Sequence, residues 1–178
     1  YTLDRWQWLC SQASKATVQQ NAGAVTPPVG YSKYLGITSS SAYTSLSTDY
    51  FLLAQRVEGF NFADMGWGAS GASAVTLSFW VRSSLTGTFG GSFENNANNR
   101  SYVFSYVISA ANTWEYKTIT VAGDTTGTWL TTNGIGITLF FSLGAGSSNI
   151  GTAGAWAAAG YVGATGQTNL VATNGATF

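Results

Sequence analysis

In two segments of the sequence, apolar residues alternate with mostly small or polar residues, with a period of two. This pattern constrains the fold more than any other feature. In residues 75–82, Val, Leu, Phe and Val alternate with Thr, Ser, Trp and Arg, and residues 135–143 alternate in the same way between aliphatic or aromatic residues and Gly, Thr, Phe and Ser. Successive side chains of a β-strand point to opposite faces of a sheet, so each segment predicts a strand with one buried face. Six further segments are expected to be strands, three of them with weaker patterns: 50–58, 102–109 and 114–121, then 2–9, 15–20 and 34–40.

Turn-forming residues separate these segments. Asn95–Asn99 is expected to form the tip of a hairpin or loop, because Asn tolerates left-handed backbone conformations. Gly123-Asp124, Asn133-Gly134 and Pro27-Pro28 mark other turns. The run from Gly154 to Gly160 is the only helix-like stretch, and it is too short to be more than a turn. Short strands with turns at intervals of about ten residues predict a β-sandwich or barrel, and no internal repeat or linker divides the 178 residues, so one domain over 1–178 is expected.

The composition excludes several classes of protein. Charged residues make up 8% of the chain, against about 25% in an ordinary soluble domain, but the 15% of aromatic residues argue against disorder. No apolar run approaches the roughly 20 residues of a membrane-spanning helix, so no membrane insertion is expected. A net charge of zero argues against binding to nucleic acid. Residues 125–178 carry no charge at all. Either an assembly buries this part, or a surface rich in Ser, Thr and Asn keeps it soluble; the sequence leaves both alternatives open.

Catalytic machinery is hard to find in this sequence. The absence of His excludes Ser-His-Asp and Cys-His nucleophilic sites and His-ligated zinc, and Cys10, the single cysteine, is expected to be a small buried residue. A glycosidase would need two facing carboxylates, which the sequence does not exclude. Several acids lie beside a basic residue, as Glu58 does with Arg56 and Glu115 with Lys117. We therefore expect a protein that is not an enzyme, although seven acids are available: Asp4, Asp49, Glu58, Asp64, Glu94, Glu115 and Asp124.

Four aromatic residues are candidates for ligand contact. Trp67, Trp129, Trp156 and Tyr161 lie in Gly-rich segments with small neutral neighbours, where a flat ring can stack on the C–H face of a sugar. The alternative is that these rings close the ends of the sandwich or form a protein interface, where Trp and Tyr are enriched. The other Trp residues are expected in the core or on sheet faces: Trp6, Trp8, Trp80 and Trp114.

Five short motifs also carry a resemblance over nearly the whole chain: LDRW at 3–6, QRVEG at 55–59, VTLSFWVRSS at 75–84, AANTWEYKTIT at 110–120 and GDTTGTW at 123–129. Together they resemble a domain that is widespread in structural proteins of tailed bacteriophages, including tail fibres. The general pattern is similar to that of jelly-roll carbohydrate-binding modules. The resemblance therefore implies a jelly-roll β-sandwich of two antiparallel sheets. The family usually continues past the GATF at 175–178 into a last strand, which implies that this chain lacks a final C-terminal strand.

The resemblance also implies a function. We expect a non-enzymatic protein of the virion surface, either a tail fibre or a capsid decoration module, that forms a homo-oligomer, with a trimer favoured. Other virion proteins and a host cell-surface glycan are the expected partners. The resemblance implies no catalytic residue and no cofactor, but it leaves a structural calcium ion open. The alternatives are a purely architectural coat or fibre subunit, a carbohydrate-binding module of a secreted enzyme and, as the weakest, a glycan hydrolase.

Overall fold

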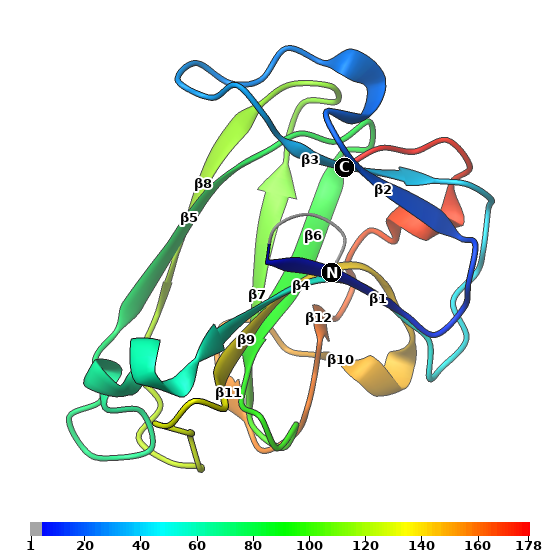
Figure 1. Ribbon diagram of the computed structural model, residues 1–178. Coiled ribbons are helices and arrows are strands. Elements are labelled where there is room, and N and C mark those ends of the chain that lie inside the picture. Colours follow the sequence, from blue (N-terminus) through cyan, green and yellow to red (C-terminus); the bar gives the residue numbers. More distant parts are fainter. Residues whose placement is uncertain (1–4) are drawn as a thin grey trace.

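The computed structural model describes residues 5–178. Asp4 and the first part of the strand expected over 2–9 therefore lie outside the described residues. The described chain is built from strands and five short 3-10 turns, with no α-helix in residues 5–178 (Figure 1). Within this range, no helix is of the length and hydropathy that crossing a membrane requires. The strands are β1 (Trp6–Cys10), β2 (Ala16–Gln20), β3 (Leu35–Ser39), β4 (Tyr50–Glu58), β5 (Val75–Val81), β6 (Gly87–Glu94), β7 (Ser101–Ile108), β8 (Glu115–Val121), β9 (Ile135–Ala145), β10 (Ile150–Gly151), β11 (Trp156–Ala157) and β12 (Gly163–Ala164).

One layer of the fold is a six-stranded sheet with the order β1-β4-β9-β6-β7-β11, which we call the large sheet. Its strands pair antiparallel throughout. The 11-residue strand β9 lies in the middle and pairs with β4 on one side and with β6 on the other. Because side chains alternate along β9, Phe141 points into the core while Phe140 points to the opposite face of the sheet.

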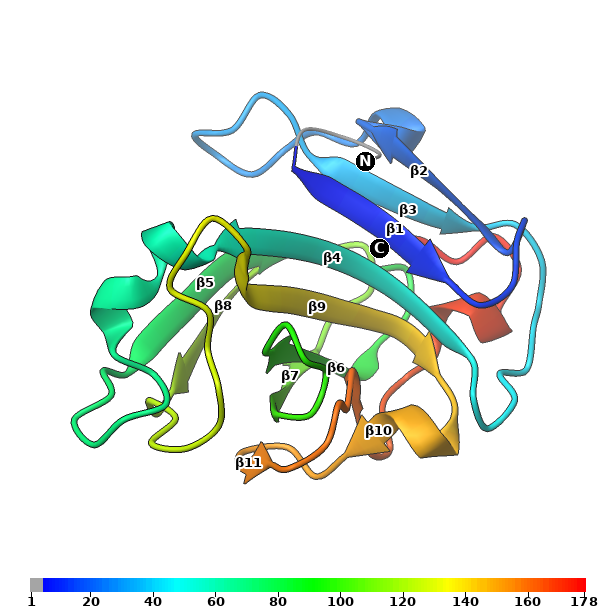
Figure 2. The ribbon, with the colours of Figure 1, turned by 60° about the horizontal axis from the view of Figure 1, so that its bottom comes forward.

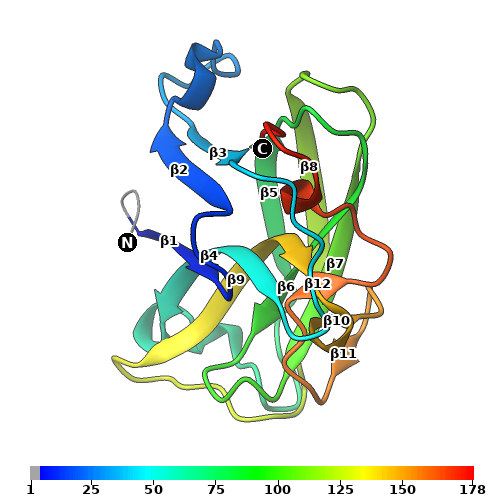
Figure 3. The same ribbon diagram turned by 90° about the vertical axis from the view of Figure 1, so that its right-hand side faces the viewer.

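The second layer consists of two antiparallel pairs, β2–β3 and β5–β8. The last residues of the chain, 176–178, lie between these pairs (Figure 3). On one side Ile37 and Phe178 exchange two backbone hydrogen bonds of 2.8 and 2.9 Å, and on the other the Ser84 N–H donates to the Thr177 carbonyl at 3.0 Å. The expected all-β sandwich of antiparallel sheets is therefore confirmed, while the jelly-roll connectivity stays a prediction.

Aromatic side chains fill the space between the layers. The ring of Phe79 from β5 lies 4.9 Å from Phe141 of β9 and 5.1 Å from Tyr106 of β7, measured between centroids. Phe89, Phe104 and other buried apolar residues belong to the same cluster. A smaller apolar cluster lies on the other face of the large sheet, where Leu52, Ala54 and Phe140 pack with Leu9 and Val162. The large sheet is thus covered on both faces, but only partly on its outer one.

Strand β6 was not expected from the sequence, although it lies near the centre of the large sheet. Its GTFGGSFE sequence carries glycines that ordinarily weaken a strand. Here they are required by close packing: a Cβ on Gly91 would collide with the Phe140 carbonyl oxygen, and one on Gly90 would lie 2.8 Å from the Ala164 Cβ. The turn expected at Asn95–Asn99 is confirmed as the connection between β6 and β7. The helix-like run from Gly154 to Gly160 contains instead the two-residue strand β11.

Candidate functional site

A groove of about 490 Å³ lies on the outer face of the large sheet. Strands β4, β9 and β6 form its floor, the turn after β6 forms one wall, and the segment around residues 149–162 forms another. Figure 2 shows the segment that carries β10 and β11 on the far side of β9 from β2 and β3. We call this cavity the outer-face groove, and it is lined by Leu9, Tyr50, Leu52, Arg56, Glu94, Asn96, Asn98, Ile135, Thr138, Phe140, Asn149, Gly160 and Val162.

The register of the strands sets the order of side chains across the groove. Arg56 of β4 is opposite Thr138 of β9, which is opposite Glu94 of β6. Neighbouring strands lie about 4.8 Å apart, so the backbones at Arg56 and Glu94 are about 10 Å apart, with Thr138 between them. In the adjoining row, Phe140 provides an apolar floor. The groove thus offers a cation and a carboxyl group at one end of an apolar surface.

Glu94 is the unusual residue of the groove. Its side chain is buried, with 3% of the residue exposed, and among residues 5–178 it has no hydrogen-bonding or ion-pair partner. Burial raises the pKa of this carboxyl to about 7. The backbone at Gly160 passes directly over it, because a Cβ there would lie 2.5 Å from Glu94 Oε1. The Glu94 carboxyl therefore faces the groove, where its oxygens stay within reach of solvent, without a partner among residues 5–178.

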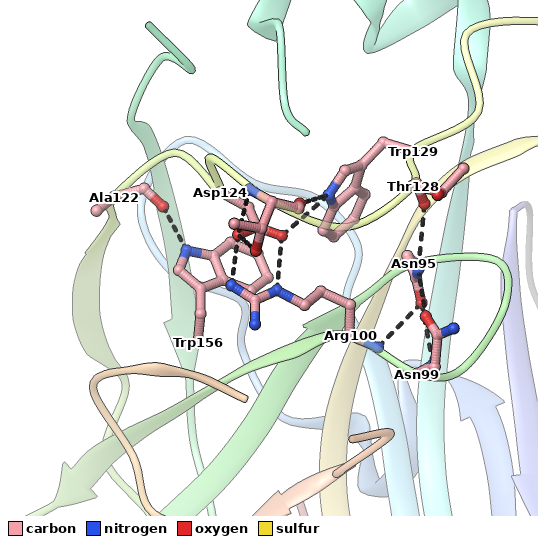
Figure 4. A network of polar contacts seen from close by, with 9 residues as sticks. Asn95, Asn99, Arg100, Ala122, Asp124, Thr128, Trp129 and Trp156 are labelled. Atoms are coloured by element: carbon pink, nitrogen blue, oxygen red, sulfur yellow. Dashed lines mark hydrogen bonds and ion pairs between the residues drawn. The ribbon is translucent and has the colours of Figure 1, made fainter. Parts of the chain in front are cut away.

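The wall that follows Glu94 is held rigidly by the side chain of Asn95 (Figure 4). Its Oδ1 accepts from the backbone N–H groups of Asn99 at 3.1 Å and Arg100 at 3.2 Å, and its Nδ2 donates to the Thr128 carbonyl at 3.1 Å. These bonds close the turn and tie it to the neighbouring loop. Asn96 and Asn98, which line the groove, are therefore carried by a fixed backbone.

Behind this wall lies an ion pair between Arg100 and Asp124. The Arg100 Nε and Nη2 atoms donate to the two Asp124 carboxylate oxygens at 2.8 and 2.6 Å, in bidentate geometry. Asp124 also accepts from the Thr126 N–H at 3.2 Å and from Trp129 Nε1 at 3.1 Å. Burial alone would raise the pKa of Asp124, but these hydrogen bonds outweigh it and hold the pKa below its ordinary value. Asp124 is thus fully satisfied inside the protein.

Three of the four predicted ligand-contact residues come together at this end of the sandwich. The ring centroids of Trp67, Trp129 and Trp156 are 4.9, 5.0 and 5.5 Å apart. Trp67 and Trp129 are buried, and Trp156 is half-buried, with its Nε1 donating to the Ala122 carbonyl at 2.9 Å (Figure 4). We call these three residues and the Arg100–Asp124 pair the aromatic end. Their position agrees with the alternative in which loop aromatics close the end of a sandwich, and their contact with a ligand stays a prediction.

Tyr161, the fourth predicted residue, lies apart from the aromatic end. It is half-buried and its ring packs closely on Gly151, where a Cβ would collide with the ring. Its backbone N–H donates to Ser101 Oγ at 3.1 Å. It precedes Val162, which lines the outer-face groove, so Tyr161 belongs to the segment that covers the large sheet rather than to the groove lining.

Three of the other acidic residues, Asp49, Glu58 and Glu115, have structural partners. Asp49 accepts hydrogen bonds from Ser11, the Leu46 N–H and Tyr43, which lower its pKa to about 2. Glu115, which lies beside Lys117 in the sequence, forms an ion pair with it at 2.6 Å. Glu58 forms no ion pair with Arg56 and accepts instead from Asn61 at 3.0 Å. In the described part of the chain, no three His, Cys, Asp or Glu side chains are grouped so that they could hold a metal ion.

Sequence reasoning missed most of the groove. Phe140 gave a usable signal, because it is an aromatic residue on the otherwise small and polar face of its strand. Asn96 and Asn98 were interpreted only as turn residues, and Glu94 only as one of seven acids. Their proximity to Arg56 depends on the pairing of β6 with β9, and β6 itself was not expected.

Comparisons with known proteins add little. No protein-family model and no curated protein sequence matches the chain. Among solved structures, the enzymatically active domain of tailspike protein 4 of bacteriophage CBA120 is similar, with a TM-score of 0.45 and 12% sequence identity. The match covers 77% of this chain but only 18% of that one. A likeness at this level carries no argument about what this protein does.

Proposed function

We propose that the protein is a non-enzymatic module of a bacteriophage virion surface, in a tail fibre or capsid decoration, that binds a bacterial surface saccharide in the outer-face groove. The motif resemblance of the sequence supports the viral setting. The observation that carries the binding site is Glu94, a buried carboxyl without a partner that faces an open groove. A saccharide hydroxyl or amide would supply the missing donor.

The chemistry of the groove fits a saccharide better than a wholly apolar ligand. Saccharides present both C–H surfaces and hydroxyl groups, and the groove offers Phe140 and Leu52 as an apolar floor and the amides of Asn96 and Asn98 along one wall. Small-molecule sites commonly combine an apolar lining with a few placed polar groups. Arg56 provides a donor on the side of Thr138 opposite to Glu94.

The lining also supports binding without turnover. Glycosidases of both stereochemical types ordinarily use two carboxyl groups, about 5 to 9.5 Å apart. Glu94 is the one carboxyl among the described residues that line the outer-face groove. The raised pKa of Glu94 would suit a general acid, but the groove supplies no second carboxylate to act with it.

The test measures binding of the purified protein to an array of bacterial surface polysaccharides. It compares the wild type with the variants Arg56→Ala and Glu94→Gln. Arg56→Ala should lose about tenfold or more in affinity, because it removes a polar contact made in a partly dry groove, and Glu94→Gln should lose several-fold, because its amide oxygen is a weaker acceptor than the carboxylate. Phe60→Ala, at an exposed aromatic residue outside the groove lining, is the matched control and should bind like wild type. If the array stays blank, or if the groove variants bind like wild type, the saccharide proposal is wrong. Release of reducing sugar would overturn the non-enzymatic part.

An architectural role is the second candidate, and one surface favours it. On the outer face of the β5–β8 pair, Trp80 and Tyr116 are opposite each other with ring centroids 5.4 Å apart, and both are exposed. They adjoin a strip of hydroxyl side chains, Thr76, Ser78, Thr118 and Thr120, which with the two rings we call the β5–β8 strip. Exposed aromatic pairs are typical of subunit contacts.

Light scattering separates the two candidates from a monomeric carbohydrate-binding module of a secreted enzyme. A homo-oligomer, with a trimer favoured, is expected in either viral role. Trp80→Ser together with Tyr116→Ser should convert it to a monomer if the β5–β8 strip is the contact, and Phe60→Ser, another exposed aromatic, is the control. A wild-type protein that is monomeric at high concentration would remove the architectural candidate.

A further inference from the structure

The sequence contains two Asn-Gly pairs, Asn133-Gly134 and Asn174-Gly175, and both asparagine side chains are exposed. Asn-Gly pairs are prone to spontaneous deamidation, because glycine has no side chain to shield its backbone nitrogen. In this reaction the Gly nitrogen attacks the Asn Cγ, the bond from Cγ to the side-chain nitrogen breaks, and ammonia leaves with the proton of the Gly N–H. A five-membered succinimide ring remains in the backbone. The surroundings of the Gly nitrogen therefore decide which pair reacts.

The pair Asn133-Gly134 has a free nucleophile. It lies in the bend just before β9, and among residues 5–178 neither the Gly134 N–H nor the Asn133 side chain has a hydrogen-bond partner. Two backbone hydrogen bonds hold the bend beside the end of β4. The Gly59 N–H donates to the Gly134 carbonyl at 2.8 Å, and the Phe60 N–H donates to the Thr132 carbonyl at 2.9 Å. Neither bond involves an atom of the ring that would form, so both can persist while the ring closes.

The pair Asn174-Gly175 is held differently. The Gly175 N–H donates to the Ser39 carbonyl at 2.9 Å, which ties the reacting nitrogen to the last residue of β3. A second bond, from the Ala176 N–H to the Thr173 carbonyl at 3.2 Å, closes the turn around the pair. The Gly175 nitrogen cannot attack Asn174 until its own hydrogen bond is broken. Reaction there requires local opening, and opening costs the free energy of the bonds that it breaks.

We propose that Asn133 is a site of spontaneous deamidation in the folded protein, whereas the fold protects Asn174. Water is the co-reactant: it adds across either ring bond to the Gly134 nitrogen or to Cγ and leaves aspartate or isoaspartate at position 133. Either product places a carboxylate in residues 125–178, which otherwise carry no charge. The site lies beside the outer-face groove, because Ile135 lines that groove.

The isoaspartate product should also loosen the bend. Its main chain runs through the side-chain carbons of residue 133 and is therefore longer by a methylene group. The extra length lies between the Thr132 and Gly134 carbonyls, which accept the bonds from Phe60 and Gly59. Since both bonds were formed with the shorter chain, they should weaken. The Gly59 and Phe60 amides should then exchange with solvent faster than in the unmodified protein.

The experiment incubates the full chain in mildly alkaline buffer, digests samples with chymotrypsin and follows both sites by mass spectrometry. Cleavage after Leu130 and Phe140 places Asn133 on one peptide, and cleavage after Leu170 places Asn174 on another. Asn133 should be converted at least about tenfold faster than Asn174, because only the second site must open first. Hydrogen exchange of the aged protein measures the Gly59 and Phe60 amides.

Two controls separate the effect of the fold from that of the sequence. In concentrated guanidinium chloride neither pair is held, so both asparagines should be converted at similar rates. Gly134→Ala shields the nitrogen and should slow conversion of Asn133 several-fold without affecting Asn174; its Cβ would lie 3.0 Å from the flexible end of Leu130. The inference is overturned if the folded protein converts both sites equally, if Asn133 stays intact while the unfolded chain reacts, or if Gly134→Ala reacts like wild type.

Discussion

The aromatic end and the outer-face groove each contain a buried acid, and the two acids differ in every other respect. Asp124 is inaccessible and accepts hydrogen bonds from Arg100, Thr126 and Trp129, which hold its pKa low. Glu94 is almost as buried but has no partner among the described residues, and burial raises its pKa to about 7. Burial therefore does not reveal the role of a carboxyl. The number of donors around it does, because a satisfied acid stabilises the fold and an unsatisfied one is available to a ligand.

The largest expected effect is the loss of the satisfied acid. Asp124→Ala should lower the free energy of unfolding by about 3–5 kcal/mol, because it leaves the partly buried Arg100 guanidinium without its acceptor and leaves the Trp129 N–H with the Thr126 carbonyl alone. Urea denaturation at pH 7 measures this. Asp64→Ala, at an exposed acid, is the control and should change stability by less than about 0.5 kcal/mol. Equal, small effects of both variants would contradict the role assigned to the aromatic end.

Glu94 should show the opposite behaviour. Its folded-state pKa of about 7 lies above the ordinary value of 4.5, so the folded protein binds the proton more tightly than the unfolded chain, and stability falls as pH rises from about 4.5 to 7. Glu94→Gln removes this ionisation. The variant should be more stable than wild type at pH 8 by up to about 3 kcal/mol and should differ little at pH 4.

Denaturation curves at the two pH values test this difference, with Glu58→Gln as the control. Glu58 is exposed and its pKa is lowered, first by a backbone hydrogen bond and also by Asn61. Glu58→Gln should therefore not gain stability as the pH is raised. A Glu94→Gln variant that is less stable than wild type at pH 8 would show that the carboxylate has a partner and would remove the contrast with Asp124.

The smallest effect is expected from an aromatic residue outside both regions. Trp80→Ala should cost about 0.5–1 kcal/mol, since the ring is 39% exposed and contributes mainly its cross-strand contact with Tyr116. Trp67→Ala, at the buried centre of the aromatic end, should cost about 3–5 kcal/mol. Thermal unfolding of the two variants side by side measures the difference. Similar losses would mean that the aromatic end does not stabilise the sandwich more than a surface pair does.

Most strands could be predicted from the sequence because their side chains alternate. The bounds expected for β4, Tyr50–Glu58, are those observed, and the other expected strands differ by a residue or two at their ends where the structure describes them. β6 was missed because local preference argues against its glycines, whereas distant packing requires them at Gly90 and Gly91. That contact involves residues more than 70 positions away, at Ala164, and no local pattern contains it.

The candidate site was harder to predict for the same reason. The sequence could predict that loop Trp residues lie at an end of the sandwich, since loop aromatics tend to close it, but not which of them are in contact. The separation of Arg56 from Glu94 by Thr138 follows only from the pairing of three strands. The unpartnered state of Glu94 depends on what is absent around it, and a sequence does not show absences of that kind.

The β5–β8 strip has a further consequence for how the molecule meets its surroundings. Its outward side chains are hydroxyls and two aromatic rings, so the six residues of the strip carry no charge. The strip itself therefore adds no long-range electrostatic attraction towards a partner, and it has no charge for salt to screen. Encounters there proceed by unguided diffusion, with association rates of the order of 10⁵–10⁷ M⁻¹s⁻¹ at any ionic strength. On such a face, selectivity is decided after arrival, by how long a contact lasts.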